Sequence, residues 1–266
     1  MSENYKKYEA YKPIKLNQRK WPTRSIEKAP TWCSVDLRDG NQALVEPMDS
    51  SRKMRMFKAL VKMGFKEIEV GFPSASETDY NFLRELINND MIPSDVTIQV
   101  LTQAREPLII KTIESLKGSK NAIIHLYNST STLQRKVVFR ETMAGGKKIA
   151  VNGAEIINRE KDVLKDTNLA FQYSPESFTG TELEYALEVC EAVLDVWEAS
   201  ASNPVIINLP ATVEMSSPNI YADQIEWMND NFSQRNRVIL SLHPHNDRGT
   251  GVAATELGLM AGADRV

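Results

Sequence analysis

Two histidines separated by a single proline follow an apolar run near the end of the sequence. His243 and His245 close the stretch VILSLHPH, and side chains two positions apart on a strand point to the same face, about 7 Å apart along it. Both imidazoles can therefore bind one metal ion. Taken alone, the pair is explained about equally well by two of the chain's three histidines falling on one surface turn.

A carboxylate and a guanidinium occur side by side in LRDGNQ at 37–42. Asp39 and the two histidines would form a two-histidine, one-carboxylate set, which suits Zn, Mn or Fe and leaves coordination positions open for a substrate. The loop sequence NDRG after His245 indicates that the histidines lie at the carboxyl end of a strand, where barrel enzymes have their active sites. Without this context, Arg38 and Asp39 would more commonly be a surface ion pair.

Polar residues recur at every second position toward the carboxyl ends of other expected strands, so each set shares one face. These sets are Gln172, Ser174 and Glu176; Asn208 and Thr212; and Ser241 with the two histidines. Barrel interiors are normally filled by branched apolar residues, so the pattern predicts a solvated pocket. His125 fits the same pocket, whereas for Glu69 we prefer a hydrogen-bonded buried group without a functional role.

Short β-rich runs alternate with segments of helical period, which is typical of repeated βα units and a parallel sheet. Strands are expected at 32–38, 66–72, 95–102, 121–127, 168–174, 204–209 and 237–243. Helices are expected at 51–63, 78–89, 106–117, 132–146, 181–199, 221–233 and 251–261. We expect the fourth helix to continue through the long stretch 140–167, with a break near Gly145 and Gly146.

This order predicts an α/β fold, a TIM (β/α)8 barrel truncated at the start of strand eight. A doubly wound sheet would carry a glycine-rich phosphate loop after its first strand, and this chain has LRDGNQ there instead. Residues 263–266 resemble a helix exit followed by the first residue of strand eight. We assign residues 1–30 to an N-terminal extension and 31–266 to the incomplete catalytic barrel.

The composition of the 266 residues is that of a globular protein, with 42% hydrophobic and 25% charged residues. A net charge of −3 with interspersed signs argues against nucleic-acid binding. No apolar stretch is long enough for a membrane span or a secretion signal. Cys33 and Cys190 have no disulfide framework around them, which favours a reduced, cytoplasmic location.

Five motifs together resemble the longer type of 2-isopropylmalate synthase, a family within the metal-dependent acyltransferase and lyase barrels. They are DLRDGNQAL at 36–44, VGFPSAS at 70–76, QYSPESF at 172–178, NLPATVE at 208–214 and LHPHNDRGTGVAATELGLMAGADRV at 242–266. The resemblance runs from about Lys12 to the last residue. It implies a Claisen-type condensation of acetyl-CoA with 2-oxoisovalerate to give 2-isopropylmalate and CoA, the first committed step of leucine biosynthesis.

The resemblance also implies roles for individual residues. It assigns Asp39, His243 and His245 to a divalent cation (Zn, Mg or Mn), Arg38 to the developing oxyanion or enolate, Glu176 to the proton relay, Thr212 to the oxo-acid carboxylate, and His125, Ser174, Asn208 and Pro210 to the pocket for the substrate's branched side chain. Acetyl-CoA is the expected co-substrate, and a homodimer is the expected assembly. Members of the family add a strand-eight asparagine ligand, a helical subdomain with a catalytic histidine and a leucine-binding domain, and we expect these outside residues 1–266.

Three other interpretations are compatible with the residues. Homocitrate and citramalate synthases would keep the metal site and change the side-chain pocket. A non-haem Fe(II) oxygenase uses the same two-histidine, one-carboxylate set. An incomplete barrel could also be a non-catalytic fragment that binds metal and oxo acid, with exposed strand edges that lower its solubility.

Overall fold

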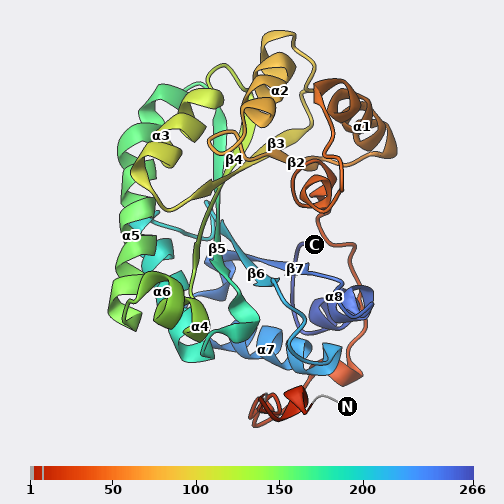
Figure 1. The fold of residues 1–266 in the computed structure, drawn as a ribbon, viewed down its shortest axis with the longest axis vertical. Coiled ribbons are helices and arrows are strands. Elements are labelled where there is room, and N and C mark those ends of the chain that lie inside the picture. Colours follow the sequence, from red (N-terminus) through yellow and green to blue (C-terminus); the bar gives the residue numbers. More distant parts are fainter. Residues whose placement is uncertain (1–2, 8) are drawn as a thin grey trace.

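A computed structural model describes residues 3–7 and 9–266 of the chain and shows a curled parallel sheet surrounded by helices (Figure 1). The sheet order is β1 to β7 in sequence order. The strands are β1 (Cys33–Ser34), β2 (Glu67–Gly71), β3 (Thr97–Gln103), β4 (Asn121–Ser129), β5 (Asn168–Glu176), β6 (Val205–Ala211) and β7 (Val238–Pro244). The helices are α1 (Ser50–Met63), α2 (Glu77–Asn88), α3 (Glu106–Ser115), α4 (Thr132–Gln134), α5 (Met143–Glu160), α6 (Leu183–Val196), α7 (Pro218–Asn231) and α8 (Gly251–Met260). The α/β barrel prediction is confirmed.

The last residues of the chain close the gap between the two ends of the sheet. Arg265 forms parallel bridges to Thr31 on one side and to Ser241 of β7 on the other. The amide of Cys33 donates to the carbonyl of Val266 at 2.8 Å, and the amide of Val266 donates to the carbonyl of Thr31 at 2.9 Å. These residues therefore occupy the place of strand eight, as the sequence predicts, and Figure 1 shows this end of the chain between the first and last strands.

Helices pack on the sheet through apolar faces, and their ends are marked by polar caps. In α1, the side chain of Asp49 accepts a hydrogen bond from the amide of Arg52, and Gly64 ends the helix in the left-handed region at φ 98°. Phe57 and Leu60 on this helix are fully buried. Each such side chain contributes about 1.5–3 kcal/mol to the free energy of unfolding.

The first strand is much shorter than the predicted range 32–38. After Ser34 the chain forms a turn of π-helix, η3 (Asp36–Gly40), in which the amides of Arg38 and Gly40 both donate to the carbonyl of Val35. The prediction of a strand to residue 38 is therefore wrong. The consequence is that a turn, and not a strand end, presents Arg38 and Asp39.

The fourth helical region also differs from the prediction. A turn of π-helix, η4 (Arg135–Phe139), follows α4, and the chain reverses at Arg140, whose φ is +54°. Thr142 then caps α5 by accepting a hydrogen bond from the amide of Gly145. The expected break at Gly145 and Gly146 is wrong because both lie inside α5, where a Cβ on Gly146 would come within 2.5 Å of a tyrosine hydroxyl on α6.

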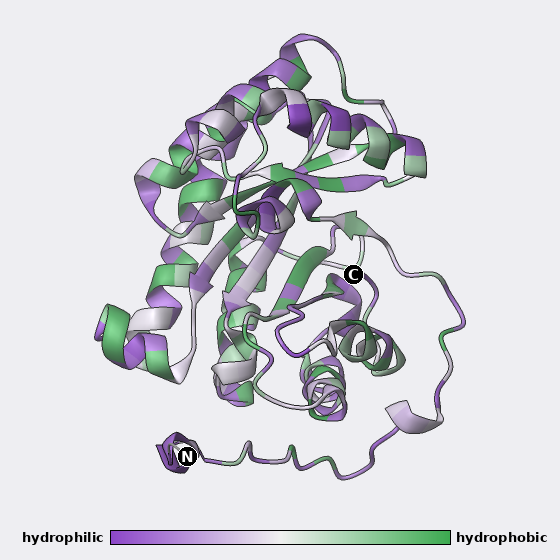
Figure 2. Cartoon of the chain, turned by 45° about the vertical axis from the view of Figure 1, so that its right-hand side comes forward, coloured by the Kyte–Doolittle hydropathy of each residue, from purple (hydrophilic) through white to green (hydrophobic). Residues whose placement is uncertain are grey.

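The N-terminal extension lies along the outside of the molecule and is largely hydrophilic (Figure 2). Two buried carboxylates on α7 anchor it. Arg19 forms two hydrogen bonds to Asp223, at 2.6 and 2.7 Å, and the amides of Lys20 and Trp21 donate to Glu226. Among the described residues, no helix has the length and apolar character of a membrane span.

Candidate metal centre and active site

A cavity of about 260 Å³ opens at the carboxyl ends of the strands. Its lining residues are Arg38, Asp39, Gln42, Phe72, Leu101, His125, Tyr127, Ser174, Glu176, Asn208, Pro210, Thr212, His243 and His245. All ten residues that the sequence assigns to the site are among them. The cavity lining repeats at every second position along β4 to β7, so the alternation inferred from the sequence brings these side chains together.

Asp39, His243 and His245 form a compact cluster of possible metal ligands, with one ligand atom from each lying within 4.8 Å of the others. The Oδ2 atom of Asp39 lies 2.7 Å from Nε2 of His243 and 3.1 Å from Nε2 of His245. Burial alone would raise the pKa of Asp39, but the hydrogen bonds from the two histidines and the charge of Arg38 hold that pKa well below its usual range. The carboxylate is therefore ionised at neutral pH.

The donor chemistry of this cluster fits a divalent cation. Two imidazole nitrogens and one carboxylate oxygen converge from two elements, β7 and the η3 turn. All three side chains are partly exposed to the cavity, so an ion bound to them would keep positions open toward a ligand there. Which ion would bind is a matter of ligand preference and availability, since imidazole and carboxylate suit several metals.

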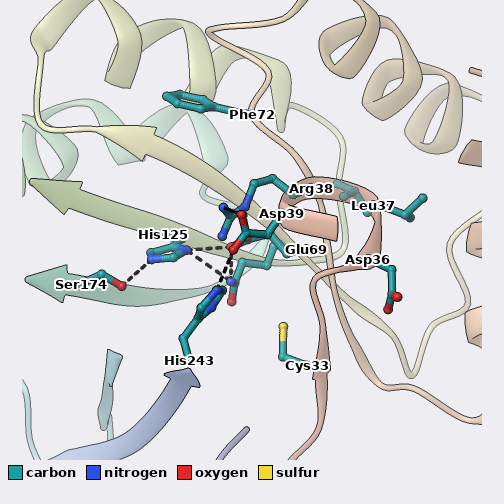
Figure 3. A network of polar contacts seen from close by, with 12 residues as sticks. Cys33, Asp36, Leu37, Arg38, Asp39, Glu69, Phe72, His125, Ser174 and His243 are labelled. Carbon is teal, nitrogen blue, oxygen red and sulfur yellow. Dashed lines mark hydrogen bonds and ion pairs between the residues drawn. The ribbon is translucent and has the colours of Figure 1, made fainter. Parts of the chain in front are cut away.

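Arg38 connects the metal cluster to a buried carboxylate beneath it. Its Nη1 lies 3.1 Å from Oδ1 of Asp39, and its Nε donates to Oε1 of Glu69, whose side chain is 0% exposed. Figure 3 shows Arg38, Asp39 and Glu69 converging in front of the strands. The guanidinium is thereby held beside the candidate metal position.

Glu69 is hydrogen-bonded and buried, as the sequence predicts, but it contacts more of the site than that interpretation expressed. Besides Arg38, it accepts hydrogen bonds from Gln99 Nε2 and from His125 Nδ1, the latter at 2.7 Å. Burial would raise the pKa of Glu69, but the charge of Arg38 and the His125 contact bring it far below its usual range. The signal that could have indicated this role is its place on the inward face of β2, in line with the other polar positions.

His125 continues this network into the pocket wall. Its pKa is lowered by burial, so the ring is neutral, and the ionised Glu69 can only accept, which assigns the ring proton to Nδ1. Nε2 then accepts from the hydroxyl of Ser174 at 2.7 Å, and Ser174 Oγ accepts from Asn208 Nδ2 at 2.9 Å. The polar hydrogens of His125 and Ser174 are therefore used within the wall.

Three apolar or aromatic residues of the cavity were not among the predicted site residues. Phe72 and Tyr127 meet edge to face, with ring centroids 6.2 Å apart, and Leu101 lies in register with His125 on the adjacent strand. Leu101 and Tyr127 lie on the same inward faces as Gln99 and His125, so the same two-residue alternation could have identified them. They make this side of the cavity largely apolar.

Thr212 and Glu176 lie at the strand exits beside the metal cluster. The hydroxyl oxygen of Thr212 accepts a hydrogen bond from the amide of Ser177 at 3.0 Å, which leaves its own hydrogen free to donate into the cavity. Burial raises the pKa of Glu176 above its ordinary value. A carboxylate with a raised pKa is a stronger base than an exposed one.

A family model described as HMGL-like matches residues 29–266. The 2-isopropylmalate synthase of Parafrankia sp. is 64% identical over 261 residues, covering 98% of this chain and 46% of the relative. That of Rhodospirillum rubrum is 62% identical over 267 residues, covering 100% of this chain and 48% of the relative. The chain thus spans about half the length of these curated relatives.

Solved structures with a similar fold have much lower sequence identity. The HMG-CoA lyase of Brucella melitensis aligns with a TM-score of 0.64 at 16% identity, covering 89% of this chain and 79% of that one. The carboxyl transferase domain of Rhizobium etli pyruvate carboxylase aligns with a TM-score of 0.63 at 12% identity, covering 93% and 41%. At these identities the likeness supports the fold alone.

Proposed function

The chain belongs to the HMGL-like family, and on that premise we propose that it carries the metal centre of a 2-isopropylmalate synthase, an acyltransferase. The reaction would condense acetyl-CoA with 2-oxoisovalerate and release 2-isopropylmalate and CoA. One observation carries the proposal: Asp39, His243 and His245 converge within 4.8 Å of one another, with Arg38 beside them in a cavity at the strand ends. The names of the similar synthases support the choice of reaction.

The oxo acid is the substrate that this arrangement suits. A divalent ion held by Asp39, His243 and His245 would polarise the keto group of an oxo acid when bound. Arg38, fixed by Glu69 on one side and next to Asp39 on the other, would stabilise negative charge on the reacting oxygen. A donor preorganised in this way commonly contributes about two to three orders of magnitude in rate.

Thr212 and Glu176 supply the remaining contacts that the condensation needs from this part of the protein. The free hydroxyl hydrogen of Thr212 would bind the carboxylate of the oxo acid. Glu176, with its raised pKa, would accept a proton from the methyl group of acetyl-CoA. That methyl group is a very weak acid, so a second group must assist Glu176.

The pocket wall favours 2-oxoisovalerate over the oxo acids of the alternative synthases. Leu101 and Phe72 offer apolar contacts to an isopropyl group. His125 and Ser174 have spent their polar hydrogens on Glu69 and on each other, so neither can donate to the second carboxylate of 2-oxoglutarate. Pyruvate would leave this part of the cavity unfilled, at a cost of about 1–3 kcal/mol in transition-state binding.

A release assay for the CoA thiol tests the proposal in the protein at its full natural length, with Mg²⁺, Mn²⁺ and Zn²⁺ supplied in turn. We expect thiol release with 2-oxoisovalerate at a kcat/KM at least tenfold above that with pyruvate or 2-oxoglutarate. A preference for either of the latter would favour the citramalate or homocitrate alternative. Oxygen consumption with Fe(II) and an oxo acid, without thiol release, would favour the oxygenase. Dimer formation and cytoplasmic location stay predictions for sedimentation and fractionation.

A further inference from the structure

We infer that Lys53, a residue of α1 outside the cavity, is a positioning residue that holds the η3 turn of Arg38 and Asp39 at a fixed distance from the strand of Glu69. The inference rests on the proposed function for its consequence in catalysis. Its basis is a set of contacts that join the backbones on either side of the Arg38–Glu69 ion pair.

The ammonium of Lys53 is completely enclosed and fully hydrogen-bonded. Its side chain is 0% exposed. Nζ donates to the carbonyl of Leu37 at 2.9 Å, to the carbonyl of Val70 at 3.4 Å and to Oδ1 of Asp79. An ammonium has three hydrogens and no acceptor, so these three contacts use all of its donors.

The two carbonyls stand one residue away from the two charges that must meet. Leu37 directly precedes Arg38, and Val70 directly follows Glu69. One ammonium therefore links the backbone of the turn to the backbone of β2 next to the point where the Arg38–Glu69 pair links their side chains. Two links at neighbouring positions restrict both the separation and the rotation of the turn relative to the strand.

The position of the ammonium is fixed in turn by α2. Asp79 binds Lys53 through Oδ1 and accepts from the amide of Phe72 through Oδ2 at 2.8 Å. A Cβ at Gly71 would come within 2.7 Å of the Asp79 side chain, so the strand leaves room for this carboxylate only because residue 71 is glycine. The pair is therefore locked between β2 and α2.

Stability alone gives little reason for a charge at this place. A buried ion pair loses so much solvation that apolar residues of similar volume often replace it at no cost, or with a gain of about 1–4 kcal/mol. A methionine could fill the volume of Lys53, yet it could not donate to the carbonyls of Leu37 and Val70. What only the ammonium supplies is the fixed distance between the turn and the strand.

The expected consequence is joint displacement of Arg38 and Asp39 when the ammonium is removed. Because Asp39 belongs to the candidate metal cluster, the affinity for a divalent ion should fall together with the rate. A misplacement of about 1 Å at a catalytic group can cost about 100-fold in rate. The effect should not add to the loss of Arg38 itself, since a displaced guanidinium has less to lose.

The test uses the double substitution Lys53→Met with Asp79→Asn, which removes both buried charges and so avoids an unpaired one. In the protein at its full natural length, Mn²⁺ affinity is measured by electron paramagnetic resonance and kcat by thiol release, with and without Arg38→Lys. The matched control is Lys66→Met with Asp95→Asn, an ion pair in which both side chains are about 60% exposed. Circular dichroism verifies that each variant is folded.

We expect the double variant to fold, to bind Mn²⁺ at least tenfold more weakly and to lose at least tenfold in kcat, while the control retains both values. Arg38→Lys should cost at least fivefold less in the double variant than in the natural protein. A folded double variant with natural Mn²⁺ affinity and kcat would overturn the inference. So would a double variant that does not fold, since Lys53 would then serve folding. If the natural protein releases no thiol, the proposed function fails, and the ratio of Mn²⁺ affinities decides this inference by itself.

Discussion

Replacing Glu69 by glutamine tests how the site holds Arg38. Glu69→Gln keeps the shape of the side chain and removes its charge. Arg38 Nε, Gln99 Nε2 and His125 Nδ1 all donate to this carboxylate, so the new amide NH₂ group must face at least one donor. Removing one partner of a buried ion pair costs about 3–5 kcal/mol, which lowers the melting temperature by roughly 10 °C in a chain of this size.

The rate should fall by about 10²–10³ because Arg38 loses the group that orients it. The stability loss should also depend on pH. The folded state holds the pKa of Glu69 below that of an unfolded carboxyl, so its contribution is complete at neutral pH and is lost as pH falls through the folded-state pKa. The difference in unfolding free energy between natural protein and variant should therefore shrink in acid.

Thermal unfolding between pH 4 and 8 and thiol-release kinetics provide the assay. Glu155→Gln, at an exposed position of α5, is the control and should change neither quantity. A Glu69→Gln variant with kcat within threefold of the natural value would refute the idea that Glu69 orients Arg38. An unfolding free energy that stayed equal to that of the natural protein at neutral pH would refute the assignment of Glu69 as a buried ion-pair partner.

Two further predictions concern the base and the pocket wall. Because burial raises the pKa of Glu176 and the base must be ionised, the acidic limb of the kcat–pH profile should lie above the range of an exposed carboxylate; Glu176→Gln should remove that limb and lower kcat by about 10²–10⁴, and an unchanged limb would exclude Glu176. Leu101→Ala should enlarge the pocket and raise the kcat/KM ratio of oxo acids one methylene longer than 2-oxoisovalerate by about 10-fold or more; an unchanged ratio would show that Leu101 does not limit substrate length.

The regular part of the site follows from sequence periodicity. Two-residue alternation on β4 to β7 was enough to predict that Ser174, Asn208 and His243 face one cavity, because parallel strands of a barrel share their carboxyl ends. Reading the same alternation further would have added Leu101 and Tyr127. Local patterns succeed here because each strand has one inward face.

The irregular part of the site depends on contacts between distant segments. The η3 turn cannot be read from LRDGNQ, since its position depends on Lys53 from α1 and on the carbonyl of Val35. Gly146 looked like a helix break, but its reason is the close approach of a tyrosine on α6. The three partners of Glu69 likewise come from three separate elements, so burial alone could not indicate its role.

The central claim is that Asp39, His243 and His245 bind one divalent ion at which an oxo acid is held beside Arg38. Pulsed electron paramagnetic resonance on the Mn²⁺-loaded protein tests it most directly, because it counts the imidazole nitrogens bound to the ion. The account predicts one Mn²⁺ per chain with two bound imidazoles, and a changed spectrum when 2-oxoisovalerate is added. A Mn²⁺ signal without imidazole nitrogen, or one that does not respond to 2-oxoisovalerate, would contradict it.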